Sequence, residues 1–173
     1  MQSSGPVDRK AATKATTHVS PVACLRLQPS RATVLVVDDS PEMRRYLRIL
    51  LEADSYRVET ASNGRQALQS LSCGCVPEIV LLDLEMPEMD GLEALRRIQE
   101  FRPRPKVIIC SGVEDPIRIL QAATLGAHSF LMKPVQHLYL SAAIERCLNE
   151  GVGKPAARSS PAQVLVLPSP GSL

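Results

Sequence analysis

The sequence predicts an α/β fold: a (βα)5 doubly wound parallel five-stranded sheet with strand order 2-1-3-4-5, helices on both faces and disordered tails. Two observations support this prediction. Strand and helix signals alternate five times between residues 33 and 150, and repeated βα units build a parallel sheet with helices on both faces. In addition, three of the strand segments are wholly or almost wholly apolar, which is typical of central strands buried on both faces.

The five strand segments are short runs with the composition of strands. In chain order they are VLVV (34–37), YRVET (56–60), IVLL (79–82), KVIIC (106–110) and AHSFL (127–131). The first run, the third run and the centre of the fourth run (107–109) contain only apolar residues, whereas the second and fifth runs are mixed. Apolar runs are expected in the middle of a parallel sheet and mixed runs at its edges, which favours the order 2-1-3-4-5.

Each strand segment is followed by a segment whose apolar residues recur at helical spacing. These residues are Met43, Leu47, Leu50 and Leu51; Ala67, Leu68 and Leu71; Leu92, Leu95 and Ile98; Ile117 and Leu120; and Leu140, Ile144, Cys147 and Leu148. Ser40-Pro41 and Asp115-Pro116 supply a cap and a first-turn proline for the first and fourth helices. We expect all five apolar stripes to pack into the hydrophobic core.

The chain of 173 residues divides into three segments by composition. Residues 33–150 are long enough for one domain with a hydrophobic core. Residues 1–32 are basic and lack sustained periodicity, and residues 151–173 are rich in proline and glycine. Both are expected to be flexible, disordered tails. Within the second tail, the short run VLVL (164–167) is a candidate docking peptide or added edge strand.

Composition also excludes several classes of protein. The apolar runs are too short to span a bilayer, and Arg26 interrupts the one apolar patch near the N-terminus, so a membrane span or a secretory signal is not expected. A cytoplasmic protein is the expected class. Cys73-Gly74-Cys75 lacks the C-x-x-C spacing of redox and zinc motifs. Cys110 and Cys147 are expected in the core as ordinary thiols.

Acidic residues follow the carboxyl ends of two predicted strands. Asp38-Asp39 follow the first strand and Asp83 follows the third. These strands are neighbours in the predicted order, so three carboxylates converge where the strand order reverses, which is where such folds bind ligands. Like charges held close repel one another, and carboxylate oxygens with open water positions suit Mg2+. The sequence therefore predicts a magnesium-binding carboxylate cluster.

Two further polar residues follow strands at the same edge of the sheet. Ser111 follows the fourth strand, and Lys133-Pro134 lies just past the fifth. Each type has a role if a carboxylate accepts a phosphoryl group, since a carboxylate can act as a nucleophile and form an aspartyl-phosphate. Mg2+ neutralises charge on the transferring group. A lysine ammonium pairs with one phosphate oxygen, and a hydroxyl donates a hydrogen bond to another.

The segment from about residue 33 to 150 resembles a response-regulator receiver domain of the CheY-like superfamily. The matching residues are VLVVDDS (34–40), LLDLEMPEMDGLEAL (81–95), Ser111-Gly112 and Lys133-Pro134. No single one of these motifs is specific, but their combination at matching intervals is. The resemblance covers about two thirds of the chain and leaves both tails unexplained.

The resemblance implies a role for each residue of the predicted cluster. Asp83 would be the phospho-acceptor, and Lys133 would contact the phosphoryl group. Mg2+ would be bound directly by Asp39, Asp83 and the backbone carbonyl of Glu85, whereas Asp38 would act mostly through a bound water. No other cofactor is implied.

The resemblance also implies a switch. Ser111 takes the position of the switch hydroxyl and Phe130 that of the switch aromatic residue, and the family often has a cis peptide bond before the proline at position 134. The phosphate would recruit Ser111, Phe130 would turn inward, and the face made by the fourth helix, fifth strand and fifth helix would be remodelled. A downstream protein target would bind that face.

The expected phosphoryl donor is a phosphohistidine on a sensor histidine kinase or a histidine phosphotransfer protein, which would dock on the first helix around Met43, Arg44 and Leu47. The domain would catalyse only its own phosphorylation and dephosphorylation, so an enzyme is not expected. Residues 151–173 are too few for a DNA-binding module, so no direct DNA binding is expected. We therefore expect a single-domain response regulator in two-component or phosphorelay signalling; the alternative is a fragment whose output domain is missing.

Three other functions remain open at this point. A receiver-like scaffold that is not phosphorylated would usually lack one of the residues above. A haloacid-dehalogenase-type phosphohydrolase would place its Asp nucleophile after the first strand, with a second Asp where this chain has Glu85. A nucleotide- or flavin-binding module would place a Gly-rich or hydroxyl-rich loop after the first strand, where this chain has Asp38-Asp39-Ser40-Pro41.

Overall fold

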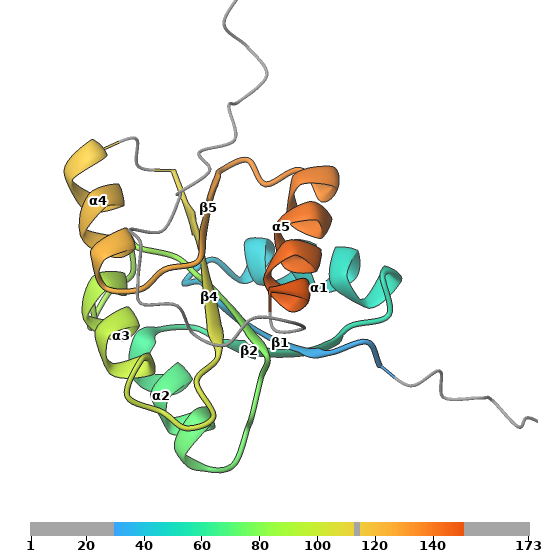
Figure 1. The fold of residues 1–173 in the computed structure, drawn as a ribbon, viewed down its shortest axis with the longest axis horizontal. Helices are drawn as coiled ribbons and strands as arrows, with labels where there is room; N and C mark the ends of the chain where they lie inside the picture. Colours follow the sequence, from blue (N-terminus) through green and yellow to red (C-terminus); the bar gives the residue numbers. More distant parts are fainter. Residues whose placement is uncertain (1–29, 113–114, 151–173) are drawn as a thin grey trace, which may run out of the picture.

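The computed structural model describes residues 30–112 and 115–150, over which strands and helices alternate five times (Figure 1). In chain order the elements are β1 (Thr33–Val37), α1 (Pro41–Ala53), β2 (Arg57–Ala61), α2 (Gly64–Ser72), β3 (Ile79–Leu82), α3 (Gly91–Ile98), β4 (Lys106–Ser111), α4 (Pro116–Thr124), β5 (Ser129–Met132) and α5 (His137–Asn149). Residues 1–29 and 151–173, with the VLVL run, lie outside the described residues.

The five strands form one parallel sheet in the order β2-β1-β3-β4-β5, which confirms the predicted topology. Helices α1 and α5 cover one face, and α2, α3 and α4 cover the other (Figure 1). Side chains alternate between the faces along each strand, so Val34 and Val36 pack toward α1 and α5, whereas Leu35 and Val37 pack toward the other three helices. This two-sided burial explains why the central strands are mostly apolar.

Strand register places the ends of β1 and β3 side by side. Val37, the last residue of β1, pairs with Leu82, the last residue of β3. The residues that follow, Asp38 and Asp83, therefore leave the sheet as neighbours. Helix α1 begins at the same edge, because the Ser40 hydroxyl accepts a hydrogen bond from the backbone N–H of Met43 at 3.2 Å and Pro41 occupies the first turn.

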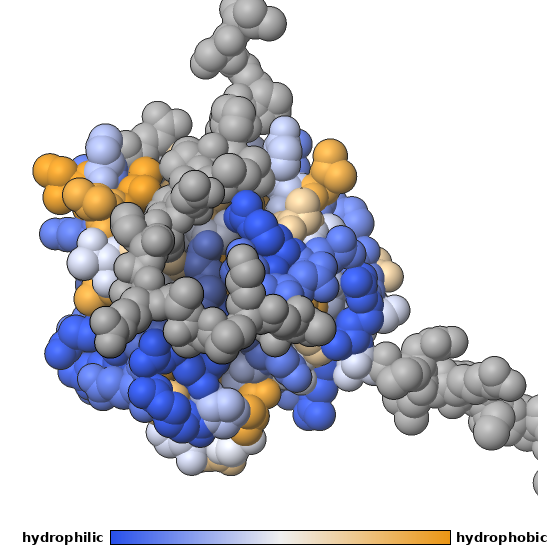
Figure 2. Space-filling view, in the orientation of Figure 1, coloured by the Kyte–Doolittle hydropathy of each residue, from blue (hydrophilic) through white to orange (hydrophobic). Residues whose placement is uncertain are grey.

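Most of the predicted apolar stripes are buried, but the prediction for the fourth helix is wrong. Ile117 and Leu120 are 67% and 68% exposed, and hydrophobic residues are visible at the surface over α4 (Figure 2). The helix instead buries Ala122 and packs Ile119 partly against the core. The pairs 117/120 and 119/122 have the same spacing of three, so periodicity alone does not decide which one faces inward.

The predicted docking surface on the first helix also needs a correction. Leu47 is 1% exposed and lies in the core between α1 and α5, so it is not available to a partner. Met43 and Arg44 are partly exposed, and Tyr46 and Ile49 are the exposed large hydrophobic residues of α1. The apolar residues of this helix therefore divide between a buried and an exposed side.

Two residues that precede the predicted domain boundary contact the domain. Ala32 is buried, and the guanidinium of Arg31 lies 3.1 Å from the carboxylate of Glu145 on α5 and 5.1 Å from the ring centre of Tyr56. The packed structure thus includes residues just ahead of residue 33. Cys110 and Cys147 are buried as predicted. In the described part of the chain, every helix is too short or too polar to cross a bilayer.

Replacing Leu47 by Ala should lower the free energy of unfolding by about 2–5 kcal/mol, because the buried side chain would leave a cavity between α1 and the sheet. Ile49→Ala on the same helix is the matched control, since Ile49 is 57% exposed, and should change stability by less than about 0.5 kcal/mol. Chemical denaturation of both variants measures the difference. Equal destabilisation by the two substitutions would contradict the burial assigned to Leu47.

Candidate functional site

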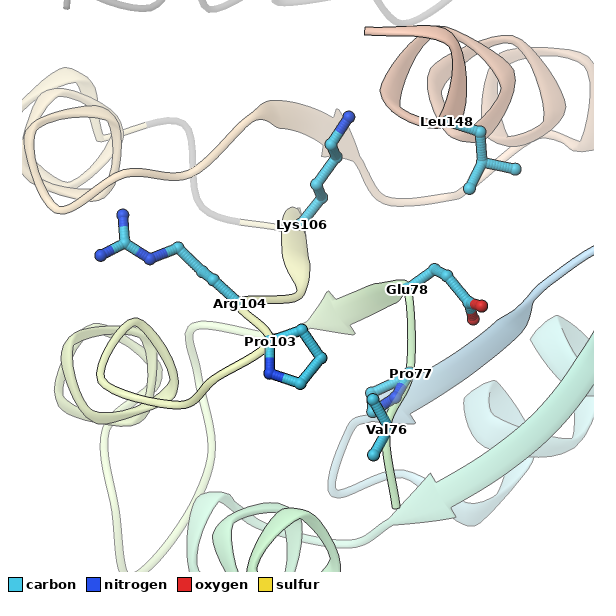
Figure 3. Close-up of a pocket in the computed structure, with 7 residues that line it drawn as sticks. All are labelled: Val76, Pro77, Glu78, Pro103, Arg104, Lys106 and Leu148. Atoms are coloured by element: carbon cyan, nitrogen blue, oxygen red, sulfur yellow. The ribbon is translucent and has the colours of Figure 1, made fainter. Parts of the chain in front are cut away.

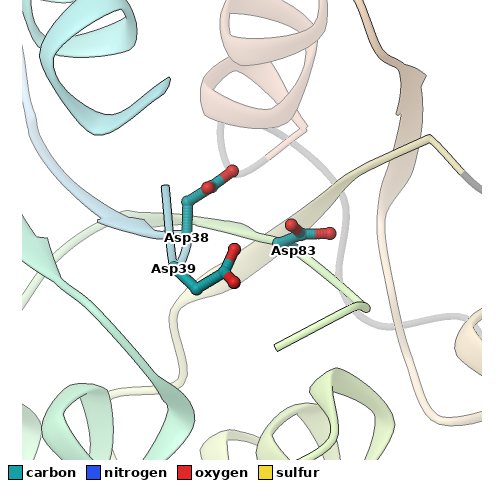
Figure 4. A group of neighbouring side chains, drawn as sticks. All are labelled: Asp38, Asp39 and Asp83. Carbon is teal, nitrogen blue, oxygen red and sulfur yellow. The ribbon is translucent and has the colours of Figure 1, made fainter. Parts of the chain in front are cut away.

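Three carboxylates gather at the carboxyl edge of the sheet. One carboxylate oxygen from each of Asp38, Asp39 and Asp83 lies within 4.8 Å of the others, and Figure 4 shows the three side chains on the ends of neighbouring strands. Asp38 and Asp83 are buried, whereas Asp39 is exposed. The structure therefore brings together the three acids that the sequence placed there.

Lys133 reaches the buried pair from the end of β5. Its Nζ donates a hydrogen bond to Oδ2 of Asp83 at 2.6 Å and lies 2.8 Å from Oδ2 of Asp38. The Lys133–Pro134 peptide bond is cis, as the resemblance implies. The backbone N–H of Lys133 donates to the carbonyl of Ser111 at 3.0 Å. This bond ties the start of the loop after β5 to the end of β4.

Burial and charge act in opposite directions on these groups. Burial raises the pKa of Asp83, because the hydrogen bonds from Lys133 and from the Glu85 N–H only partly offset the loss of water. Burial alone would lower the pKa of Lys133, but its pairing with Asp38 and Asp83 outweighs this effect and the pKa is raised. Lys133 is therefore held as a cation beside the two buried carboxyl groups.

Local hydrogen bonds orient the loops that hold the acids. The Ser40 N–H donates to Oδ1 of Asp38 at 2.9 Å, and the Glu85 N–H donates to Oδ1 of Asp83 at 3.1 Å. From α1, Nη1 of Arg44 donates to the backbone carbonyls of Asp38 at 2.6 Å and Asp39 at 2.9 Å. Arg44, which is predicted to lie at a partner-docking surface, therefore also binds the loop after β1.

The donor set fits a divalent cation. Three carboxylates face one lysine, so negative charge is in excess at the cluster. Oδ2 of Asp38 is buried, and it forms a 2.8 Å ion pair with Nζ of Lys133. Oxygen ligands of this kind suit Mg2+. Glu85 follows Asp83 by two residues, and its side chain is exposed.

The two predicted switch residues lie in the neighbouring strands. Ser111 is the last residue of β4 and is buried; in register it pairs with Met132 of β5. Phe130 of β5 pairs with Ile109 and is 1% exposed, in the core between the sheet and helices α2, α3 and α4. Phe130 therefore has the inward orientation, and Ser111 lies on the strand between Asp83 and Lys133.

One residue that the sequence reasoning left without a role is Gly91, the first residue of α3. A Cβ atom at this position would lie 2.2 Å from the carbonyl oxygen of Asp83 and 2.5 Å from Cα of Leu84. Because no side chain fits there, α3 packs directly on the backbone that carries Asp83. The glycine after Met89-Asp90 was visible in the sequence, but nothing in the sequence indicated what it contacts.

A pocket of about 310 Å³ lies at the opposite edge of the sheet (Figure 3). Its lining comes from the segments before β3 and β4 and from the end of α5, and includes Val76, Pro103 and Leu148. Ligand sites in doubly wound folds lie at the carboxyl ends of the strands. The pocket at the amino ends is therefore separate from the carboxylate cluster.

The comparisons with known proteins agree with this geometry. The family profile "Response regulator receiver domain" matches residues 34–145. The chain is 36% identical over 104 residues to the chemotaxis protein CheY of Thermotoga maritima, covering 60% of this chain and 86% of that protein. It is 44% identical over 103 residues to protein-glutamate methylesterase/protein-glutamine glutaminase 3 of Rhodospirillum rubrum, where the match covers 58% of this chain but 28% of that longer protein.

Among solved structures, a chain of the CheX–CheY–BeF3–Mg2+ complex from Borrelia burgdorferi superimposes with a TM-score of 0.63 at 27% identity, covering 67% of this chain and 88% of that one. The profile match includes both acid-bearing strand ends, Ser111 and Lys133. Taken with the sheet order and the carboxylate cluster, this match shows that the chain belongs to the response regulator receiver domain family of two-component signalling.

Proposed function

We propose that the chain accepts a phosphoryl group on Asp83 from a phosphohistidine of a sensor histidine kinase or histidine phosphotransfer protein, and that phosphorylation changes its affinity for a protein target. The observation that best supports this proposal is the buried carboxylate of Asp83 beside two further acids, with Nζ of Lys133 2.6 Å away. Aspartate can act as a nucleophile and form a covalent phosphoryl intermediate.

In the proposed step, a carboxylate oxygen of Asp83 attacks phosphorus, a P–O bond forms, and the P–N bond to the donor histidine breaks. The Glu85 N–H holds Oδ1 of Asp83, which fixes the direction of the carboxylate. Lys133 turns from Oδ2 of Asp83 to a phosphoryl oxygen and keeps its positive charge at the site. The Ser111 hydroxyl donates a hydrogen bond to another phosphoryl oxygen.

Asp39, Asp83 and the backbone carbonyl of Glu85 would hold Mg2+, with Asp38 acting through water. When bound, Mg2+ neutralises charge on the transferring group. The excess of negative charge at the three carboxylates supports this assignment. The Borrelia burgdorferi structure, whose title names CheY, BeF3 and Mg2+, gives it further support.

The proposed target surface is the face formed by α4, β5 and α5. Ile117 and Leu120 are exposed large apolar residues of α4, and Leu138 is 75% exposed at the start of α5. Large exposed apolar side chains on both helices favour a protein partner. Ser111 ends β4 and Phe130 lies on β5, so both predicted switch residues lie on strands next to the proposed face or within it.

We further propose that the chain turns over no separate substrate and binds no DNA directly. The methylesterase relative matches this chain over 28% of its length, so the activity in its name is not assigned to this chain.

Incubation with Mg2+ and a small phosphodonor should add one phosphoryl group to the full chain, because the carboxylate of Asp83 lies beside two further acids that can hold Mg2+ and beside the ammonium of Lys133. Intact mass spectrometry measures the adduct. The Asp83→Asn variant should gain none, and removal of Mg2+ with a chelator should prevent the reaction in the wild type. The matched control is Asp115→Asn, which changes a carboxylate at the same edge and keeps a good helix cap.

An equal adduct on Asp83→Asn would contradict the proposed acceptor. A folded wild type that gains no adduct from either a small donor or phosphohistidine proteins would instead support a scaffold that binds partners without phosphorylation.

Mg2+ should stabilise the fold by relieving repulsion among the carboxylates. At a free concentration 100-fold above its Kd, the gain in unfolding free energy should be about 2.7 kcal/mol. Thermal denaturation with MgCl2, compared with KCl of equal ionic strength, measures this gain. Asp39→Asn should lose most of it and Asp115→Asn should keep it. A wild type with no gain, or an equal gain in Asp39→Asn, would contradict the assigned ligands.

A further inference from the structure

Arg118 lies on α4 but binds the loop that follows Asp83. Its Nη2 donates to Oδ1 of Asp90 at 2.6 Å and approaches the carbonyl oxygen of Leu84 at 3.4 Å. Leu84 is the residue next to Asp83, and Asp90 caps α3 by accepting a hydrogen bond from the Leu92 N–H at 3.2 Å. One side chain of α4 therefore contacts both ends of the loop between β3 and α3.

The Arg118–Asp90 ion pair is expected to contribute little to the stability of the fold. Its side chain is 28% exposed, and its Nε is buried with no hydrogen-bond acceptor among the described residues. A buried donor without a partner costs free energy that offsets much of what an ion pair contributes. Asp90 is about half exposed, which weakens the pair further. A role in positioning accounts for this arrangement better than a role in stability.

The loop that Arg118 holds needs a fixed position. Its backbone contains Leu84 and Glu85, which directly follow the proposed acceptor. On its other side, α3 packs against the carbonyl of Asp83 through Gly91, whose N–H donates to the carbonyl of Leu84 at 3.1 Å. The carbonyl of Leu84 thus faces both Gly91 and Arg118. A shift of Arg118 would move the chain segment adjacent to Asp83.

Helix α4 is attached to the core by few side chains. Ala122 is its buried residue, and Ile117 and Leu120, which lie close to Arg118 in sequence, are exposed. A helix with little buried apolar surface can shift at low cost. The Arg118–Asp90 pair therefore connects α4 specifically to the loop between β3 and α3.

We propose that Arg118 is a positioning residue, which holds the β3–α3 loop in the geometry needed for phosphorylation of Asp83 and couples that loop to α4. The effect on phosphorylation rests on the proposed function of Asp83, whereas the claim that Arg118 holds the β3–α3 loop does not. Coupling of this kind acts in both directions, so a change in the position of α4 alters the loop as much as a change in the loop alters α4.

The test compares Arg118→Ala, Asp90→Ser and the double variant in the full chain. Serine is itself a good helix cap, so Asp90→Ser removes the carboxylate and keeps the start of α3. The matched control is Arg97→Ala, which breaks an ion pair with Glu93 that lies within α3 and does not reach another element. Phosphorylation by a small donor, amide exchange by NMR and thermal unfolding are measured for each variant.

Both single substitutions should slow phosphorylation by about threefold or more, and the double variant should be no slower than Arg118→Ala, because the two residues act through one contact. Amide exchange should rise at Glu85 and Gly91, whose N–H groups bond within the loop, while exchange in the central strands stays unchanged. The unfolding midpoint should change little, and Arg97→Ala should behave as the wild type in each measurement.

Additive effects of the two substitutions, unchanged exchange at Glu85 and Gly91, or a general loss of stability with Arg118→Ala would overturn the proposal. The exchange measurement needs no phosphoryl transfer. If the wild type is not phosphorylated but exchange at the loop still responds to Arg118→Ala, the proposed function fails and the positioning role stands. If the wild type is phosphorylated and the variants match it, the positioning role fails alone.

Discussion

Repulsion among three carboxylates at one edge of the sheet is the constraint on which the rest of the site depends. Asp38 and Asp83 are buried side by side because Val37 and Leu82 end their strands in register. Two buried carboxylates so close together are tolerated only with a compensating charge. Lys133 supplies one such charge from β5, and the remaining excess fits a divalent cation. The site is therefore assembled from three strands and is complete only when the sheet has formed.

Backbone packing around the acids is as specific as their charge. Gly91 lets α3 rest against the carbonyl of Asp83, and Arg44 binds the carbonyls of Asp38 and Asp39 from α1. Both residues contact the backbone that carries the carboxylates. The close packing of α3 on the backbone of Asp83 restricts movement of the loop after β3. Stabilisation of charge requires such a preorganised site.

Helix α4 exposes two of its large apolar residues, Ile117 and Leu120, while Ile119 packs partly against the core. The cost of exposing Ile117 and Leu120 is offset if a protein partner covers them. The same helix contacts the β3–α3 loop through the side chain of Arg118, which donates to Asp90. A helix that is held by a polar contact and a small buried surface can shift at low cost.

Much of this protein was determined by the sequence itself. The alternation of short apolar runs with helical stripes established the parallel sheet and its order, and the acids after two apolar runs located the carboxylate cluster, because side-chain burial and strand ends leave direct marks in the sequence. The tertiary structure decided which side of each helix is covered, as Leu47 and Ile117 show. It also decided the contacts of Gly91 and Arg118, because these contacts join different secondary-structure elements and local spacing does not encode them. Local periodicity specifies elements, whereas contacts between elements depend on packing that forms only when the chain folds.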